Sequence, residues 1–409
     1  MKQIRHRYFA TLLWVAGLVF LSACGRDTEY HPDVTTPPTI GQSTPAPTES
    51  SIGYPAITGG DTLPYPYIIE PIIVGYGGQW PLNGLLTIPP TATLQNPVPA
   101  AVLVQGSGAA NMNQSIMWEG EAINRPFFDV ATYLSANGIA VIRNDKRDYA
   151  HVDALMALAA QDITAFGSRT VWEEAIEDAL LAAELLRADP RINSERIYLI
   201  GLSLGAVLSP RIQLAAQERG FEFAGLVLMA GTPRCVVEVT LMQFNDNIEA
   251  AWAELEALEP NTDPLITKAF ESDIVEMQAM LDLITEAASM IWDTPPEEAR
   301  GMFWLGGSFY YFQDLANPTF EEAVAGIDTR MLIMQAARDF QVRTDICFVE
   351  MQRILSSREN VTFNLYEDLN HVFMPSTATN HLEHGREIIS PGRMDTQVLQ
   401  DITAWIHGR

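Results

Sequence analysis

The segment GLSLG (201–205) holds a serine between two glycines. The apolar, β-branched run at 196–200 predicts a buried strand before it, and the helical spacing at 206–217 predicts a helix after it. On such a tight strand–turn–helix, side chains two positions from the serine would clash, and glycines avoid this. The five-residue pattern alone also arises by chance, so the flanking strand and helix are what indicate a nucleophile at Ser203.

A serine hydroxyl is a weak nucleophile at neutral pH and needs a histidine base that an acid orients. In sheets with such an elbow, the acid and the histidine follow the serine along the chain, each after the carboxyl end of a strand. Asp339 comes just after a predicted strand at 330–334, and His371 after one at 361–366. We therefore predict a catalytic triad of Ser203, Asp339 and His371.

The competing residues fit this order less well. Asp345 is the main rival acid, but it falls inside the helix predicted to follow the strand. His381 and His384 are spaced for one helical face, yet no further cysteine or histidine set accompanies them, so we expect surface residues and no metal site. The remaining histidines lie in the wrong place: His6, His31, His151 and His407.

Two backbone N–H groups are candidates for stabilising an oxyanion. Leu204 follows the nucleophile, and its N–H would face the reaction centre. The predicted strand at 100–105 ends in a glycine-flanked turn, which makes the N–H of Ser107 the second candidate. The alternative is that this second segment is only a turn. The chemistry requires no metal ion and no organic cofactor.

The elements that would position these residues alternate between strand and helix from about residue 100. Two strand-like runs at 65–74 and 80–88 come first, joined by a glycine-rich turn and with prolines typical of a sheet edge. The next predicted strand, at 100–105, is apolar throughout, as in strands that helices cover on both faces. The chain is therefore predicted to be an α/β protein with a mostly parallel central sheet.

Residues 234–325 interrupt this alternation with Met, Leu, Trp and Ala at helical spacing, many acidic residues and no convincing central strand. We expect a helical cap inserted into a core formed by 63–233 and 326–409, with a large crossover connection as the alternative. The aromatic stretch at 301–315 either lines the substrate pocket or packs the cap on the core.

The beginning of the chain does not resemble a folded domain. Residues 1–23 place basic residues before an apolar run and small residues, which predicts a secretory signal whose end resembles a bacterial lipobox. We expect cleavage before Cys24, a lipid on that cysteine and a disordered Thr/Pro-rich linker over 24–62. An ordinary cleaved signal or an uncleaved anchor is the alternative. The protein would then be exported and lipid-anchored at the bacterial cell envelope, outside the cytoplasmic membrane.

The composition of the chain excludes some classes of binding partner. The chain has 409 residues, 51 acidic and 25 basic, and a formal net charge of -26, which argues against nucleic acid and against a polybasic membrane contact. In an exported, disulfide-permissive setting, Cys235 and Cys347 are candidates for a bridge that ties the cap to the core. Two separate buried thiols are the alternative.

Taken together, several segments resemble α/β-hydrolase-fold serine hydrolases of the bacterial esterase and acyl-thioesterase type, with dienelactone-hydrolase and prolyl-oligopeptidase relatives. The resemblance covers roughly 65–409 and implies the same triad. It departs from the family where the elbow often reads G-H-S-x-G-G, because this chain has Leu202 and Ala206 there, and this leaves substrate choice open. The segments are VLVQGSG (102–108), PFFDVATYLSANGIAVIRNDKR (126–147), RIYLIGLSLGA (196–206), GTPR (231–234), LIMQAARDFQV (332–342) and LYEDLNHVF (365–373).

The resemblance implies hydrolysis of small or medium carboxylic esters through an acyl-enzyme. An exported peptidase or thioesterase of the same fold is an alternative, as is a binding lipoprotein that kept the fold without catalysis. No repeat of the β-propeller kind accompanies the domain, which disfavours a peptidase that cleaves after proline. An exported enzyme would rarely meet acyl-CoA, which disfavours a thioesterase.

Overall fold

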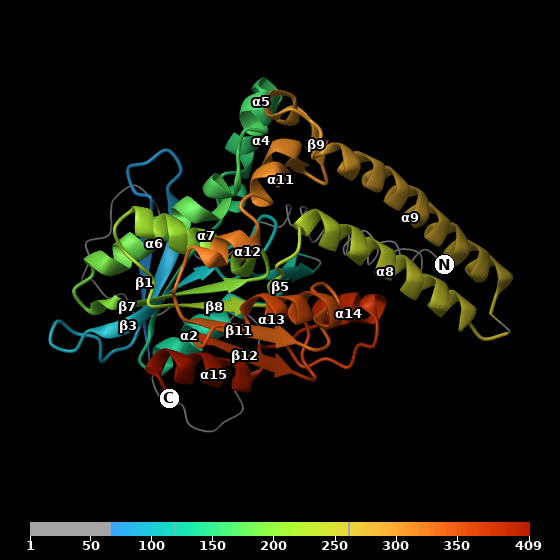
Figure 1. Cartoon of the computed structure of the whole chain (residues 1–409). Coiled ribbons are helices and arrows are strands. Elements are labelled where there is room, and N and C mark those ends of the chain that lie inside the picture. Colours follow the sequence, from blue (N-terminus) through green and yellow to red (C-terminus); the bar gives the residue numbers. More distant parts are fainter. Residues whose placement is uncertain (1–66, 119, 261) are drawn as a thin grey trace.

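The computed structural model describes residues 67–118, 120–260 and 262–409. The predicted signal, Cys24 and the linker at 24–62 lie outside the described residues. An eight-stranded sheet crosses the molecule with helices on both faces (Figure 1). In spatial order its strands are β1 (Ile68–Val74), β2 (Leu82–Ile88), β6 (Ala140–Asn144), β3 (Val98–Val104), β7 (Ile192–Leu202), β8 (Gly225–Met229), β11 (Met331–Ala336) and β12 (Val361–Tyr366).

In this sheet β2 runs antiparallel to both of its neighbours, and the other strand pairs are parallel. The hairpin of β1 and β2 forms one edge, where Pro71 is tolerated because an edge strand need not donate every N–H to a neighbour. Strands β3, β8 and β11 are buried at every position. The prediction of an α/β fold with a mostly parallel central sheet is confirmed.

Alternate side chains of the central strands enter two separate hydrophobic clusters, as the two-residue period of a strand requires. In β3, Ala100 and Val102 belong to one cluster, and Ala101 and Leu103 belong to the other. The first cluster packs against α6 (Glu177–Ala188) and α7 (Leu204–Glu218) and the second against α2 (Pro126–Ala136) and α15 (Thr396–His407). The core therefore lies on both faces of the sheet and holds its strands in fixed register.

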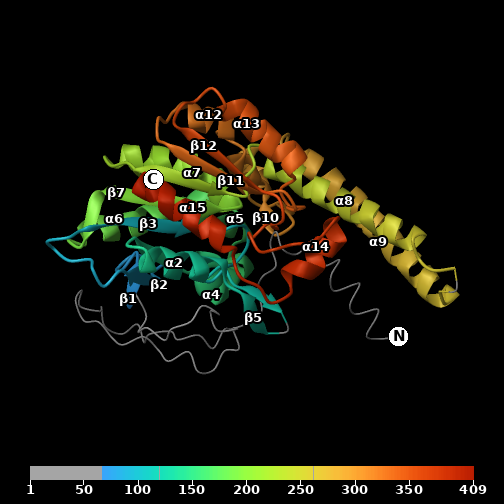
Figure 2. The ribbon, with the colours of Figure 1, turned by 90° about the horizontal axis from the view of Figure 1, so that it is seen from below.

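A long insert connects β8 to β11, which are neighbours in the sheet. Its first two helices form an antiparallel pair that projects from the body as an arm (Figures 1 and 2). The insert consists of α8 (Val236–Glu256), α9 (Pro264–Met290), α10 (Pro296–Ala299), β9 (Phe303–Trp304), β10 (Gly307–Ser308), α11 (Phe309–Leu315) and α12 (Phe320–Ala325). The insert is mainly helical, with a short hairpin of β9 and β10 in addition.

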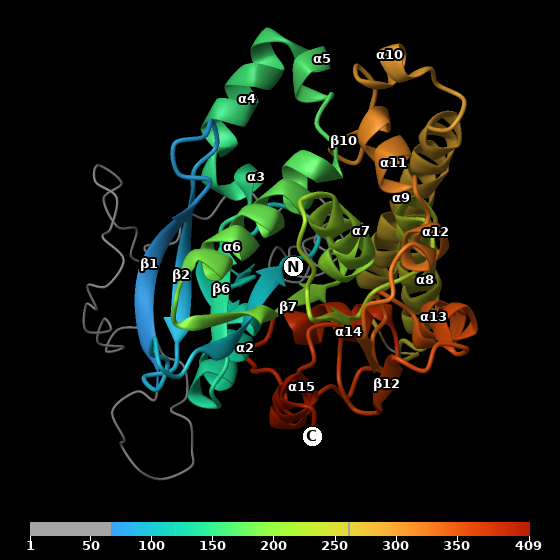
Figure 3. The same ribbon diagram turned by 60° about the vertical axis from the view of Figure 1, so that its left-hand side comes forward.

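Several shorter elements surround the ends of the strands. The rings of Phe166 in α5 and Phe303 in β9 stack with centroids 6.0 Å apart, so α5 meets the insert (Figure 3). The elements are β4 (Ile116–Trp118), β5 (Glu121–Asn124), α3 (Arg147–Ala150), α4 (Val152–Gln161), α5 (Ile163–Phe166), the π-helical turns η1 (Trp172–Ile176) and η2 (Thr344–Phe348), α13 (Val349–Leu355) and α14 (His381–Ile388). In the described ranges no helix is both long and apolar enough to span a membrane.

The expected disulfide is wrong, because Cys235 and Cys347 are both free thiols. The Cys347 thiol is buried and hydrogen-bonded to the hydroxyl of Thr232, and burial raises its pKa to about 11. The Cys235 thiol lies at the start of α8, where it accepts hydrogen bonds from the backbone N–H groups of Val237 and Glu238, and burial raises its pKa as well. Each sulfur thus has its own local partner.

Candidate active site

Ser203 lies at the sharp turn between β7 and α7 with φ of 55° and ψ of -116°. Such a backbone is costly for a residue with a side chain and persists only where the surroundings impose it. A Cβ on Gly205 would lie 2.1 Å from the carbonyl oxygen of Val104, and one on Gly201 would lie 2.3 Å from the Gly205 carbonyl group. The N–H of Ser203 donates to the carbonyl oxygen of Met229 over 2.8 Å. The turn is therefore fixed by close backbone contacts that only glycine allows.

Asp339 follows β11, and His371 follows β12. The imidazole Nδ1 of His371 lies 2.8 Å from Oδ2 of Asp339, which is 2% exposed. The other carboxylate oxygen accepts the backbone N–H groups of Gln341 and Val342, each over 2.9 Å. Burial alone would raise the pKa of Asp339, but the charge and hydrogen bond of His371 and the N–H of Val342 hold it below its usual value. An ionised carboxylate in this place favours the imidazole tautomer with hydrogen on Nδ1.

The turn that carries His371 is shaped by Asn370. Its side-chain oxygen accepts the N–H groups of Val372 and Met374, each over 3.1 Å, and its own N–H donates to the carbonyl oxygen of Met374 over 2.9 Å. Phe373 takes a φ of 59°, which a tight turn of this kind requires. Together these bonds fix the backbone on both sides of His371, which is 5% exposed.

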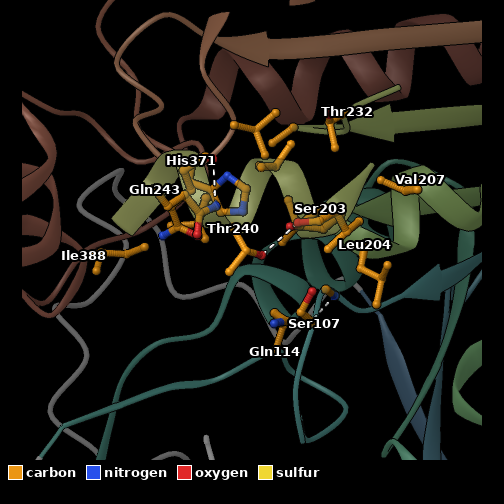
Figure 4. Close-up of a pocket in the computed structure, with 18 of the residues that line it drawn as sticks. Ser107, Gln114, Ser203, Leu204, Val207, Thr232, Thr240, Gln243, His371 and Ile388 are labelled. Carbon is orange, nitrogen blue, oxygen red and sulfur yellow. Dashed lines mark hydrogen bonds between the residues drawn. The ribbon is translucent and has the colours of Figure 1, made fainter. Parts of the chain in front are cut away.

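Ser203 and His371 line the same pocket, at the carboxyl ends of the central strands (Figure 4). No hydrogen bond joins them within the described residues, which is common for a serine and its base before substrate binds. Aliphatic and neutral polar side chains make up most of the wall, and among the described residues that line it only His371 has an ionisable side chain. The other lining residues are Gly106, Ser107, Gln114, Ile116, Leu202, Leu204, Val207, Ala230, Thr232, Val236, Val239, Thr240, Gln243, Gln341, Val342, Val372 and Ile388.

Both predicted oxyanion donors lie at this pocket. Leu204 is the first residue of α7, where an N–H has no partner within the helix. Ser107 follows Gly106, which lies so close to the elbow that a Cβ there would be 3.2 Å from the Cβ of Ser203. In the described part of the chain, neither N–H donates to a protein group. Two backbone donors therefore flank the nucleophile.

The insert contributes to the pocket through α8, which the sequence did not indicate. Its first turns supply lining residues that include Val239, Thr240 and Gln243. The aromatic stretch at 301–315 contributes none, and the ring of Trp304 instead packs on Phe312 with centroids 5.1 Å apart. Of the two alternatives for that stretch, packing of the insert is therefore the correct one.

The expectation that His381 and His384 lie on the surface is wrong. Both are buried in α14, which packs against α8, and the ring of Phe340 contacts both imidazoles. Burial lowers the pKa of each to about 4, so both are neutral at pH 7. Among the described residues, no group of three or more His, Cys, Asp or Glu side chains is placed to hold a metal ion.

Comparison with known proteins gives one curated relative with a sequence match. The chain is 30% identical to esterase EstD from Thermotoga maritima over 325 residues, which are 80% of this chain and 65% of that protein. The chain therefore spans just under two thirds of the relative's length. No family model matches the chain.

Solved structures resemble the chain at lower identity. Est1E from Butyrivibrio proteoclasticus aligns with 83% of this chain and 99% of its own, at 14% identity and a TM-score of 0.45. Dipeptidyl peptidase 4 from Porphyromonas gingivalis aligns with 84% of this chain and 36% of its own, at 13% identity and a TM-score of 0.44.

Proposed function

We propose that this protein is a serine hydrolase that cleaves carboxylic esters, with Ser203 as nucleophile, His371 as general base and Asp339 as the acid that orients it. One observation carries the proposal. Ser203, on a strained glycine-flanked turn, shares a pocket with an imidazole whose Nδ1 is held 2.8 Å from a buried carboxylate. The similarity to an esterase over most of the chain supports the same reaction class.

In the proposed reaction, His371 takes the hydroxyl proton as Ser203 attacks the ester carbonyl carbon. The negative oxygen that forms accepts hydrogen bonds from the N–H groups of Leu204 and Ser107, and each such donor is worth about 3–4 kcal/mol. The intermediate collapses, and His371 gives its proton to the departing alcohol. Water, deprotonated by His371, then attacks the acyl-enzyme and releases the acid and free Ser203.

The chemistry of the pocket points to a neutral substrate. Its wall is mainly aliphatic, and apart from His371 the described residues that line it present no ionisable side chain that would pair with a charged group on the substrate. A peptidase that binds a free amino terminus needs a carboxylate there, so this wall favours an ester with a small or medium aliphatic acyl group. A thioester would fit the same geometry and is distinguished by experiment.

The test is hydrolysis of short and medium p-nitrophenyl esters and of matched thioesters by the purified protein. The wild type is expected to turn over the esters, and Ser203→Ala to lose at least about 10⁴-fold in kcat with an unchanged circular dichroism spectrum. Faster turnover of thioesters would revise the substrate class. A wild type that neither hydrolyses any substrate nor reacts with a fluorophosphonate at Ser203 would overturn the proposal in favour of a binding protein.

We further propose, from the sequence alone, that Cys24 is lipidated and tethers the exported protein to the cell envelope. Cys24→Ser is expected to abolish metabolic labelling with an alkyne fatty acid and to shift the protein from the membrane to the soluble fraction. Retention of the label in that variant would contradict the anchor without affecting the proposed hydrolysis.

A further inference from the structure

The peptide group between Gly106 and Ser107 carries one of the two proposed oxyanion donors. In a trans peptide the C=O and N–H bonds point in opposite directions, so whatever holds the carbonyl also sets the direction of the N–H. The carbonyl oxygen of Gly106 accepts a hydrogen bond from Nζ of Lys146 over 2.9 Å. Lys146 therefore acts on the far end of the group whose N–H belongs to Ser107.

The preceding peptide group is held as well. The N–H of Gly106 donates to the side-chain oxygen of Gln114 over 3.1 Å (Figure 4). Strand β3 ends at Val104, so the sheet no longer fixes the backbone at this point. Beyond the end of the strand, the side chains of Gln114 and Lys146 therefore hold the backbone of Gly106 in its orientation.

Lys146 is a costly residue in this position. It follows β6, is 3% exposed, and its ammonium lies 2.5 Å from a carboxylate oxygen of Glu174. Taking two charges out of water costs several kcal/mol per ion, and a buried ion pair is weak evidence for stability by itself. Because the ammonium of Lys146 also donates to the carbonyl oxygen of Gly106, its burial is better explained by orienting that peptide group than by stabilising the fold.

The arrangement extends into the insert. The second carboxylate oxygen of Glu174, in the π-helical turn η1, accepts a hydrogen bond from the hydroxyl of Tyr311 in α11. Burial and the charge of Glu174 raise the pKa of Tyr311 well above its usual value, so the phenol keeps its proton and remains a donor. A continuous chain of hydrogen bonds thus runs from Tyr311 through Glu174 and Lys146 to the carbonyl of Gly106.

We propose that Lys146 is a positioning residue that orients the N–H of Ser107 toward the oxyanion. Through Tyr311 and Glu174, this orientation depends on the position of the insert relative to the sheet. The inference rests on the proposed function, since it assumes an oxyanion beside Ser203. Helix α11 is seated by Arg211, whose guanidinium donates to the carbonyl oxygen of Asp314 over 2.7 Å. Displacement of α11 would withdraw the Tyr311 hydroxyl and release Glu174 and Lys146 from their present positions.

The test compares Lys146 with its neighbour Arg147, which offers a matched control. Arg147 is 5% exposed and forms its own buried ion pair with Asp178 at 2.6 Å, and within the described residues its guanidinium donates to Asp178 and Glu177 and not to Gly106. The variants are Lys146→Met, Arg147→Met and the double variant Lys146→Met/Glu174→Gln. The double variant leaves no unpaired buried charge, so it is the one to use if Lys146→Met fails to fold.

The readouts are kcat, KM and the inhibition constant of a trifluoromethyl ketone, which forms an oxyanion on the serine. Loss of one donor predicts that kcat falls roughly 10²-fold in the Lys146 variants, that KM changes less than about twofold and that the inhibition constant rises in parallel with the loss of kcat. Arg147→Met should lower the melting temperature but change kcat by less than about threefold. Tyr311→Phe should reduce kcat by a smaller factor, again without a change in KM.

A folded double variant with kcat within about threefold of wild type would overturn the inference, and so would an equal kcat loss in Arg147→Met. Fluorophosphonate labelling of the wild type separates this failure from that of the proposed function. A wild type with neither labelling nor turnover means that the proposed function has failed. A wild type that labels without turning over the test esters allows the same comparison on labelling rates.

Discussion

The carboxyl-end edge of the sheet and the arm of α8 and α9 are built by different kinds of constraint. At the edge, each important residue has its own contact, such as the 2.1 Å approach that forbids a side chain at Gly205 or the 2.8 Å hydrogen bond between Asp339 and His371. On the arm, large apolar side chains are left in water, among them Leu265 at 68% and Leu283 at 64% exposed. Single substitutions at the edge should therefore cause a loss of activity or stability, whereas on the arm only substitutions on the buried face should lower the stability.

The largest effect is expected at the edge from Asp339→Asn. An amide at this position can donate where the carboxylate accepted, which favours the wrong imidazole tautomer, and the corresponding change in a serine protease lowers kcat about 10⁴-fold. The measurement is kcat on the best p-nitrophenyl ester, with circular dichroism to check the fold. The control is Asp345→Asn, because Asp345 is exposed and pairs with Arg343. Comparable losses in both variants would show that Asp339 has no special role.

The next effect concerns the stability of the elbow. Gly205→Ala places a methyl group 2.1 Å from the carbonyl oxygen of Val104, so α7 must move away from β3. We expect the free energy of unfolding to fall by about 3 kcal/mol, the upper range for overpacking. Gly301→Ala is the matched control, because its added methyl group meets only the carbonyl oxygen of Glu298 at 3.6 Å. Urea denaturation measures both, and equal losses would contradict the close-packing argument.

The candidate site residues at the edge of the sheet could be predicted from the sequence because each is marked by a short local pattern. Ser203 comes directly after β7, and Asp339 and His371 come in the turns that follow β11 and β12. Parallel strands bring such positions to one edge. The strained φ of Ser203 follows from the two glycines beside it, which can be read without a structure.

The features that the sequence missed depend on partners far along the chain. The burial of His384 is set by α8, more than one hundred residues earlier, so the short helix α14 gave no sign of it. The bond of Lys146 to Gly106 exists only because β6 lies beside β3. The bridge between Cys235 and Cys347 is a related case, because placing two cysteines after neighbouring strands does not by itself make them a pair, and both are free thiols.

A smaller effect is expected from pH at the seam between edge and arm, where α14 packs on α8. The pKa of His384 is about 4 in the folded protein against 6.5 in an exposed histidine, so the unfolded chain binds protons first as the pH falls. The contribution of His384 to stability is therefore full above pH 6.5 and is lost between 6.5 and 4, which amounts to about 2 kcal/mol between pH 7 and 4.5. His381, beside Asp246 and with a pKa of about 4, acts in the same direction.

The measurement is the free energy of unfolding in urea at pH 7 and 4.5. His384→Gln should change the difference between the two values by about 2 kcal/mol, because glutamine does not titrate and only the contribution of His384 is removed. His407→Gln, in the last helix, is the control and should leave the difference as it is in the wild type. If the difference between pH 7 and pH 4.5 is the same in His384→Gln as in the wild type, the burial argument for α14 is contradicted.

The last prediction tests the arm with one substitution at two positions of the same helix. Leu281 is 9% exposed on the face of α9 that packs inward, whereas Leu283 is 64% exposed. Leu281→Gln buries an amide in an apolar setting and should cost about 2–3 kcal/mol of unfolding free energy. Leu283→Gln should change it by less than about 0.5 kcal/mol and leave kcat unchanged. If both cost the same, the outer face of α9 is covered in solution, and the arm is constrained residue by residue as the edge is.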